Sequence, residues 1–208
     1  MQVRLIKQSA EIIKDLDTVY LKITGDYNVS REYQDNPFSR VRLKYSDNPN
    51  IPNIYDVPTH YITTSNRVIL ENGWEDDLKD EVPKPSEYHL KRISMKFICD
   101  TQVAHNLFGE KLKFNISENN IVGDNIELII PDHMDISSKW KEDLCNSYNH
   151  LISKGWDEQK ARSMLPICLK TEIIMTGFED SWRELFNKTF SNSQTNALLK
   201  LAKEKILK

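Results

Sequence analysis

The sequence predicts an α+β fold in a single domain that spans residues 1–208. Helical patterns are mixed with a few strand patterns, and the two do not alternate as regular βαβ units. The chain has only six glycines, and it contains neither a G-x-G-x-x-G nor a G-x-x-x-x-G-K-[ST] motif. Rossmann and P-loop nucleotide binding therefore lack support, and a doubly wound parallel sheet is not expected.

The first third of the chain is predicted to be the less regular part. Residues 3–6 indicate an opening strand, and residues 10–16 indicate a short amphipathic helix. Residues 24–63 are rich in Asn, Asp and Pro, which predicts a divergent, loop-rich excursion that is clearest at residues 46–53. Tyr61 and Ile62 indicate that part of this excursion is packed.

The next elements are marked by helix caps. Ser65 is a good N-cap for a helix that ends at Gly73, and the acidic residues 75–81 are expected to form a solvated connector. Residues 93–99 alternate as a strand, and Asp100 can cap the helix that follows and ends at Gly109.

The second half continues with strands and longer helices. Strands are predicted at residues 126–130 and 171–176. Ser137 or Ser138 caps a long helix with an apolar stripe at helical spacing, and Asp157 caps another that Pro166 stops. Closing helices are expected around residues 182–186 and 196–206. Trp140 and Trp182 are predicted to be core residues.

Composition excludes several classes of protein. The net charge is −3, so no broad positive field attracts a nucleic-acid polymer, although a local anion site for a mononucleotide needs only a few donors. The three cysteines are widely spaced and form no C-x-x-C pair, which argues against a zinc site. The sequence has no signal peptide and no membrane-length apolar run, so we expect a cytoplasmic protein with no membrane partner.

Residues alone do not indicate a reaction. There is no H-E-x-x-H or G-x-S-x-G motif, and the five histidines form no metal-ligand cluster, so no metal is expected and no catalytic residue can be named. Glu118 lies in a predicted polar loop, where a solvated carboxylate is the simplest interpretation. Arg162, on a capped helix, would by itself be taken for a surface arginine.

Two blocks, in the correct order, resemble the flavin-dependent thymidylate synthases. Residues 91–108 read KRISMKFICDTQVAHNLF and resemble the family stretch RR-x-T-V-K-F-I-C-D-R-G-V-S-H-E-L-V. Residues 161–166 (ARSMLP) and 170–176 (KTEIIMT) resemble the family's A-R-S-V-L-P and K-T-E-I-V-M-T, followed by Trp182, Arg183 and Phe186 of W-R-x-F-F. Between the blocks, residues 125–131 (NIELIIP) resemble N-E-I-T-F-I-I-P. The resemblance covers residues 91–202 well and residues 1–90 poorly.

The resemblance implies a fold, a reaction and an assembly. Members of the family have a twisted mixed or antiparallel sheet flanked by helices and form homotetramers, with sites built between protomers. They convert dUMP to dTMP with FAD, NADPH and methylenetetrahydrofolate. The resemblance makes Lys111, Glu118 and Arg162 the candidates for nucleotide or flavin binding in this chain.

Several family residues are replaced in this chain. The family's Arg-His-Arg falls on Gly109, Glu110 and Lys111, so Lys111 alone keeps a positive charge and lacks the planar fork of arginine. Glu110 places a negative charge where the family has a cation. The flavin-binding Thr-x-Asn becomes residues 176–178, and a uracil-polarising arginine and a downstream histidine fall on Thr189 and Thr195.

Three hypotheses follow from this pattern. The first is a degenerate relative that acts as a scaffold or regulatory subunit, as a homo-oligomer or with an active paralogue. The second is an active flavin-dependent enzyme that modifies dUMP or another deoxypyrimidine nucleotide. The third is reuse of the fold for unrelated partner binding, with residues 24–63 as the new surface.

Overall fold

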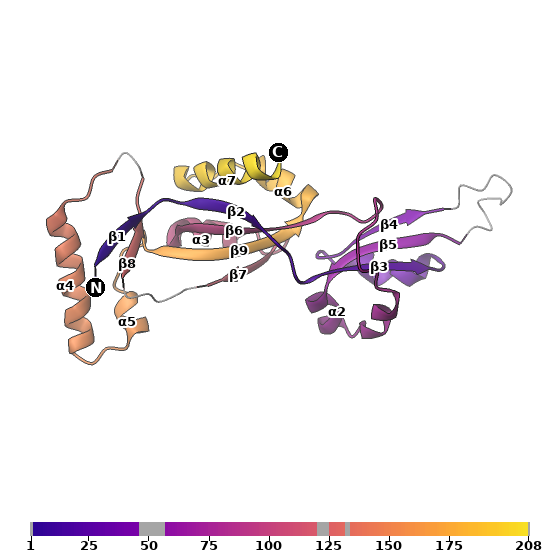
Figure 1. Ribbon diagram of the computed structural model, residues 1–208, viewed down its shortest axis with the longest axis horizontal. Helices are drawn as coiled ribbons and strands as arrows, with labels where there is room; N and C mark the ends of the chain where they lie inside the picture. Colours follow the sequence, from indigo (N-terminus) through magenta and orange to yellow (C-terminus); the bar gives the residue numbers. More distant parts are fainter. Residues whose placement is uncertain (1, 46–56, 120–124, 132–133, 208) are drawn as a thin grey trace.

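The computed structural model describes residues 2–45, 57–119, 125–131 and 134–207, and these form an elongated α+β molecule (Figure 1). Its strands form three sheets, in the orders β2-β6-β9-β7, β3-β5-β4 and β1-β8. Figure 1 shows the four-stranded sheet in the middle of the long axis, with one smaller sheet at each end. The α+β prediction is therefore confirmed.

Two long antiparallel strands form the middle of the molecule. β6 (Arg92–Asp100) and β9 (Lys170–Phe178) pair along their whole length, from Arg92 opposite Phe178 to Asp100 opposite Lys170. β2 (Ser9–Ile13) pairs with β6, and β7 (Asn115–Glu118) pairs with β9. Their inward side chains, Met95, Phe97, Ile173 and Met175 among them, have no exposed surface.

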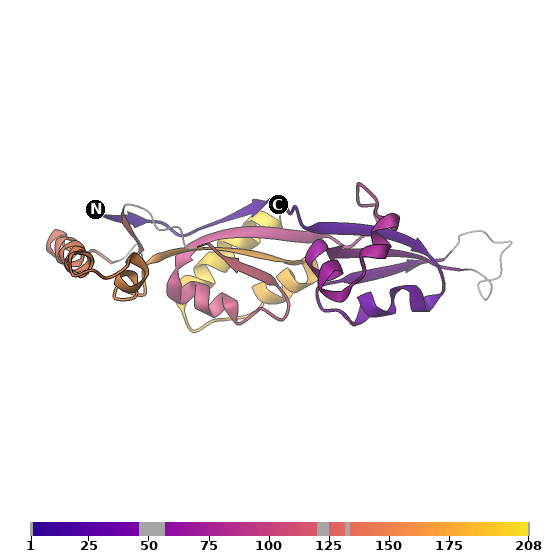
Figure 2. The same ribbon diagram turned by 90° about the horizontal axis from the view of Figure 1, so that it is seen from below.

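Three helices cover one face of this sheet. α3 (Thr101–Phe108), α6 (Glu179–Phe186) and α7 (Ser193–Ile206) pack on the sheet in one hydrophobic cluster, and Figure 2 shows them on the same side. Trp182 of α6 is fully buried, and its indole N–H donates to the carbonyl oxygen of Ile93 at 3.1 Å. The indole also meets the Phe114 ring edge-on, at 4.7 Å between ring centroids. Trp182 therefore ties α6 to β6, as the prediction of a core tryptophan requires.

Short helical segments cover one face of the second sheet. β3 (Thr18–Thr24), β5 (Thr59–Ser65) and β4 (Arg40–Lys44) are antiparallel. Their apolar face packs with side chains of the short helical segments, in a cluster that includes Tyr33, Ile69, Trp74 and Leu78. Those segments are η1 (Tyr27–Ser30), α1 (Arg31–Asp35), α2 (Asn66–Asn72) and η3 (Glu75–Asp80).

A buried arginine joins the middle sheet to the second one. The Arg92 side chain, at the start of β6, is only 3% exposed, and its Nη1 lies 3.6 Å from Asp15 Oδ2 and 4.0 Å from Asp17 Oδ2. The same nitrogen donates to the Thr18 hydroxyl and to the Thr64 carbonyl oxygen. Burial lowers the pKa of Arg92, and the two carboxylates oppose that shift. The guanidinium thus stays paired where β2, β3 and β5 meet.

The opposite end of the molecule carries a parallel pair of strands. β1 (Val3–Ile6) runs beside β8 (Ile126–Ile129), and α4 (Ser138–Ser153) and α5 (Glu158–Arg162) pack around them (Figure 1). Tyr148 of α4 and Ala161 of α5 are buried in the same cluster. No helix among the described residues has the length and hydropathy that a membrane crossing requires.

The predicted helix caps are confirmed. Ser65, Asp100, Ser137 and Asp157 each accept a hydrogen bond from the backbone N–H three residues later. Gly73 ends α2 in the left-handed region, with a φ of 72°.

One helix predicted in the first part of the chain was wrong. The predicted helix at residues 10–16 is replaced by β2, because pairing with the edge of β6 outweighs a short helical pattern. Residues 24–63 include α1, β4 and most of β5, and residues 46–53 lie outside the described residues, so a divergent, loop-rich excursion at 24–63 stays a prediction.

Two further expectations need correction, and one stays untested. Glu118 lies at the end of β7 rather than in a loop, and Trp140 is 38% exposed rather than a core residue. β3 was not foreseen at all. That residues 1–208 form one domain stays a prediction.

Close packing at Gly177 gives a first test. A Cβ built on Gly177 would lie 2.5 Å from Cδ1 of the buried Phe114 ring. We therefore expect Gly177→Ala to lower the free energy of unfolding by about 1–3 kcal/mol, as measured by urea denaturation. In a Phe114→Leu background the same substitution should cost less, and an equal cost in both backgrounds would contradict this origin.

The cap of α3 gives a test by pH. Burial raises the pKa of Asp100, although the N–H groups of Val103 and Gln102 oppose the shift. The folded state therefore holds the proton more tightly than the unfolded state, so the contribution of this group to stability falls as pH rises above about 3.9.

Asp100→Asn keeps a capping oxygen and removes this titration. We expect its free energy of unfolding, relative to that of the native sequence, to rise as the pH increases from about 4 to 7. Asp100→Ala should lose the cap and about 1 kcal/mol. A constant difference between Asp100→Asn and the native sequence across this range would rule out the shift.

Candidate functional site

An ion pair occupies the corner between the end of α3 and the segment before α7. Lys188 Nζ lies 2.8 Å and 2.7 Å from the two carboxylate oxygens of Glu110. The Glu110 side chain is 11% exposed and that of Lys188 is 41% exposed. The negative charge that Glu110 places at a cation position of the family is therefore compensated by Lys188.

A second contact, which is partly buried, joins α3 to α7 near the same corner. The amide nitrogen of Asn106 on α3 donates to the hydroxyl of Thr195 on α7 at 3.0 Å. Thr195 is fully buried, and its backbone N–H is capped by the Asn192 side chain. The resemblance places a histidine of the family at Thr195. In this chain the Thr195 side chain instead joins α3 to α7 through its hydrogen bond with Asn106.

The three residues at the end of β9 that replace the family's Thr-x-Asn are also used internally. The Thr176 hydroxyl lies 2.7 Å from the Ser94 hydroxyl on β6, and both residues are buried. Gly177 lies against Phe114. The Arg40 guanidinium lies over the Phe178 ring, 4.6 Å from the ring centroid, in a cation–π contact. The side chains of Thr176 and Phe178 are thus in contact with neighbours in the same chain, and Gly177 and Phe178 have no polar side-chain atom.

Lys111 lies in the turn after α3, and its side chain is exposed. It lines a small pocket of about 210 Å³ together with Phe38, Arg67, Glu71 and residues 114–116. Arg67 Nε donates to Glu71 Oε1 at 2.7 Å, so the arginine in this pocket is paired. Of the three residues at the Arg-His-Arg positions, Lys111 is the cation, and its side chain is exposed to solvent.

Glu118 lies at the far end of β7 from Lys111. Its Oε1 accepts a hydrogen bond of 2.8 Å from the hydroxyl of Thr171 on β9, and its side chain is exposed. Glu118 therefore keeps a partly solvated carboxylate at the edge of the middle sheet.

Arg162 is the last residue of α5 and is half-buried. Burial and the carboxylate of Glu158 raise the pKa of Tyr148, and the positive charge of Arg162 lowers it. Arg162 is thus close enough to α4 for its charge to act on a buried tyrosine.

The three predicted residues come from different parts of the fold. Asn115, which follows Lys111 closely, is paired with Thr176, whereas Glu118 is paired with Ile173. The two ends of β7 are therefore about 10 Å apart. Arg162 lies in α5, beside the β1-β8 pair at one end of the molecule (Figure 1). That all three bind one ligand stays a prediction.

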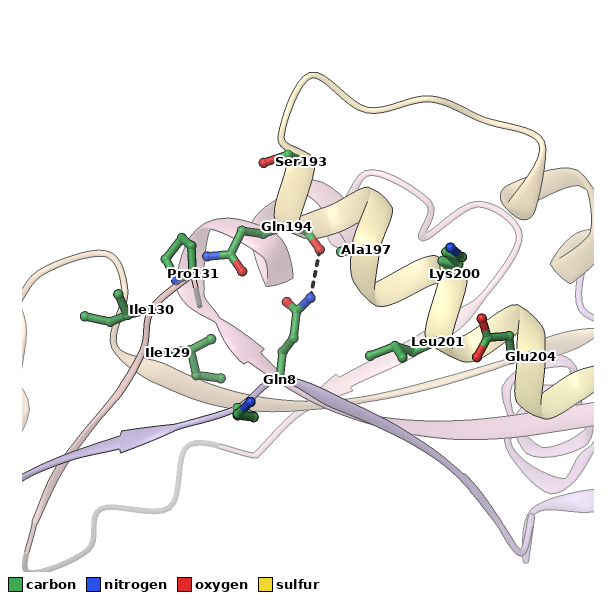
Figure 3. A pocket seen from close by; sticks show the side chains of 11 residues that line it. Gln8, Ile129, Ile130, Pro131, Ser193, Gln194, Ala197, Lys200, Leu201 and Glu204 are labelled. Atoms are coloured by element: carbon green, nitrogen blue, oxygen red, sulfur yellow. Dashed lines mark hydrogen bonds between the residues drawn. The ribbon is translucent and has the colours of Figure 1, made fainter. Parts of the chain in front are cut away.

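A different region holds a groove that the sequence did not indicate. It lies between the β1–β2 corner, the end of β8 and one side of α7, and its volume is about 560 Å³ (Figure 3). Gln8, Gln194 and Lys200 line it, none of which belongs to a recognisable motif. The position of Gln8 beside this groove could not be predicted from the sequence, because residues 10–16 were predicted to be a helix and not the strand β2. Among the described residues, no group of three or more His, Cys, Asp or Glu could hold a metal.

Comparisons with known proteins identify the architecture. The family model described as thymidylate synthase complementing protein matches residues 88–205. A crystal structure of the UMP/dUMP methylase PolB from Streptomyces cacaoi bound with 5-Br UMP has a TM-score of 0.52 and 8% identity over 99% of this chain and 92% of that one. The same methylase bound with 5-Br dUMP has a TM-score of 0.50 and 9% identity, with the same coverage. No curated protein matches the sequence.

The Glu110–Lys188 pair can be tested by a double-mutant cycle. Because the Glu110 carboxylate is largely shielded from water, we expect Glu110→Gln and Lys188→Met to show a coupling free energy of about 1 kcal/mol in urea denaturation.

The pair formed by Lys113 and Glu184 is a matched control, since its lysine is about as exposed as Lys188 but its carboxylate side chain is 55% exposed, against 11% for Glu110. The cycle of Lys113→Met with Glu184→Gln should give a smaller coupling. If the two cycles gave the same coupling, Glu110 and Lys188 would be an ordinary surface pair.

Proposed function

The chain belongs to the thymidylate synthase complementing protein family, that of the flavin-dependent thymidylate synthases, and we propose that it is a member without a self-sufficient synthase site that serves as a scaffold or regulatory subunit. The observation that carries this proposal is the ion pair between Glu110 and Lys188. It occupies the corner where family members hold cations for phosphate-bearing ligands.

The energetic argument concerns lost guanidinium donors. Each charge-assisted hydrogen bond contributes roughly 1.5–3 kcal/mol. The replacements at residues 109, 110 and 189 remove several such bonds. A loss of about four would remove most of a micromolar affinity, which corresponds to about 8 kcal/mol. Lys111 does not replace them, because its ammonium is a point charge without a planar fork.

The positions that would hold FAD fit it poorly in this chain. Thr176 is hydrogen-bonded to Ser94, Gly177 is packed against Phe114, and Thr195 is joined to Asn106. These contacts support a protein that does not retain its own flavin. NADPH and methylenetetrahydrofolate would have a role only if catalysis persists.

The proposed partner is another chain of the same architecture. Lys111 and Glu118 flank β7 of the middle sheet, whereas Arg162 lies in α5 at one end of the molecule. We therefore propose a homo-oligomer such as a tetramer, or a hetero-oligomer with an active paralogue in the cytoplasm. Such an assembly would let this chain contribute Arg162 to a site completed elsewhere.

A second candidate function is an active flavin-dependent enzyme that modifies C5 of dUMP or another deoxypyrimidine nucleotide. It is favoured by one observation: Lys111 and Glu118 are exposed and Arg162 is half-buried, so their charged ends are not enclosed in the core. If neighbouring chains brought them together, they would supply two cations and a carboxylate.

The absorbance spectrum of the purified protein separates the two candidates. We expect less than a stoichiometric amount of bound FAD, and no release of tritium from 5-labelled dUMP in the presence of methylenetetrahydrofolate, FAD and NADPH. The corner occupied by the ion pair lacks the donors that such binding needs.

Stoichiometric FAD, or tritium release that Arg162→Met abolishes, would refute the proposal in favour of the active enzyme. An active family member assayed in parallel controls for the reagents. Lys160→Met, which changes an exposed lysine of the same helix, controls for the loss of charge in α5.

A further inference from the structure

The segment that joins η3 to β6, residues 81–91, passes over the second sheet, and we call it the strap. At its start, the Val82 N–H donates to the carbonyl oxygen of Tyr20 on β3 at 2.8 Å. Near its end, the buried His89 ring meets the rings of Tyr20 and Tyr61 edge-on, with 5.3 Å between centroids in each case. His89 is therefore the buried side chain that fixes the strap to the sheet.

The strap lies on the face of the sheet opposite the helical segments. Leu21 and Ile62 belong to the cluster that packs against those segments. Tyr20 and Tyr61, their neighbours along β3 and β5, point to the other face because side chains alternate along a strand. There the Tyr88 ring of the strap covers the Tyr61 ring, with 4.8 Å between centroids. Release of the strap would thus uncover the Tyr61 ring.

Hydrogen bonds fix the protonation state of the His89 ring. Its Nε2 lies 3.1 Å from the Leu21 carbonyl oxygen, which can only accept, so Nε2 carries the proton. Its Nδ1 lies 3.0 Å from the backbone nitrogen of Ser86, whose N–H can only donate, so Nδ1 carries a lone pair. The Ser86 hydroxyl also lies 3.0 Å from Nδ1. The ring that holds the closed strap is therefore neutral.

The strands beneath the strap offer no counter-charge to a protonated His89. The three described strands β3, β4 and β5 contain no Asp or Glu. Asp15, which acts on the Tyr20 hydroxyl, is paired with the buried Arg92. The titratable and charged side chains on this side of the sheet are Tyr20 and Lys22 of β3, Tyr61 of β5, Arg40, Arg42 and Lys44 of β4, and Lys84, Glu87, Tyr88 and Lys91 of the strap. Glu87, the carboxylate of this set, is exposed.

The proton affinity of His89 depends on whether the strap is closed. Burial lowers the pKa of His89, and the hydrogen bond to the Leu21 carbonyl opposes that shift. The closed strap thus holds a proton on this ring less tightly than an open strap, in which the ring would have the ordinary pKa of about 6.5. Closure is fully favoured above that pH. Below it, the closing equilibrium weakens by up to about tenfold for each pH unit.

We propose that the strap is a cover that acid releases from the second sheet, with His89 as the residue that takes up the proton. The proton binds at Nδ1, so the ring and the Ser86 backbone N–H then point hydrogens at each other. The Ser86 hydroxyl can turn to accept from the ring, but the backbone N–H is left without its acceptor. A charged ring would also stay buried beside two tyrosine rings, which costs more than exposing it to water. This inference does not depend on the proposed function.

The first test is the titration of the His89 ring, followed in the full chain by NMR through the two-bond ¹H–¹⁵N couplings of the imidazole. We expect a neutral ring with its proton on Nε2 at about pH 7.5, and a midpoint below the ordinary value of about 6.5. A proton on Nδ1 at that pH, or a midpoint at or above the ordinary value, would overturn the inference.

The second test is amide hydrogen exchange at residue 89, whose backbone N–H donates to the Ser86 carbonyl oxygen at 3.1 Å. Rates are corrected for the intrinsic pH dependence of exchange, so that they report the open population. We expect that population to rise about tenfold between about pH 7 and pH 5. The amide of Phe97, in the central strand β6, should show no such rise.

Two variants assign the rise to one residue. His89→Gln keeps an amide N–H for the Leu21 carbonyl oxygen and takes up no proton in this range, so the rise at residue 89 should be lost. His60→Gln is the matched control, because His60 is fully buried on the other face of the same sheet, with its Nε2 at 3.0 Å from the Gly25 carbonyl oxygen. This variant should keep the rise.

Three results of the exchange experiment would contradict the inference. They are a native chain without any rise at residue 89, a rise that persists in His89→Gln, and a rise that His60→Gln abolishes. Should His89→Gln not fold, the ring titration and the exchange at residue 89 in the native chain decide the matter.

Discussion

The antiparallel pairing of β6 with β9 is the constraint on which the rest of the structure depends. Their nine-residue register places the starts of α3 and α6 at opposite ends of the same pair of strands, because α3 follows β6 directly and α6 follows β9 directly. Trp182 fixes α6 to the backbone of β6, and Arg92 fixes the start of β6 to β3 and β5. The middle sheet and the β3-β5-β4 sheet are thus positioned by one strand pair.

The same framework explains how a family site can be lost without loss of the fold. The core on β6 and β9 is apolar and does not require the cations that ligands need. Position 110 pairs with Lys188, position 195 with Asn106, and position 177 with the Phe114 ring. Each replacement satisfies a neighbour in the same chain, so the folded state keeps its contacts while the donors for an anion decrease. A well-packed scaffold is therefore compatible with the proposed regulatory role, because the contacts of this core do not depend on donors for a ligand.

Elements held by local hydrogen bonds could be predicted from the sequence, whereas elements that depend on distant partners could not. The caps at Ser65, Asp100, Ser137 and Asp157 are local hydrogen bonds within four residues, and the sequence was sufficient to find them. β2 and β3 depend on partners far along the chain. The sequence of β2 therefore suggested a helix, and that of β3 gave no strand prediction. In the site, Lys111, Glu118 and Arg162 could be named by resemblance, but the Glu110–Lys188 pair spans 78 residues and has no sequence signal. The Gln8 groove has none either, since it forms only where three distant segments meet.

A crystal structure of the protein grown with excess FAD and dUMP tests most directly whether the corner at residues 109–111 is closed by contacts within the chain. The account predicts that Lys188 remains on Glu110, that Asn106 remains on Thr195, and that no phosphate lies within hydrogen-bond distance of residues 109–111. A structure in which Lys188 leaves Glu110 to bind a phosphate of either ligand, with Lys111 and Arg162 beside it, would contradict the account.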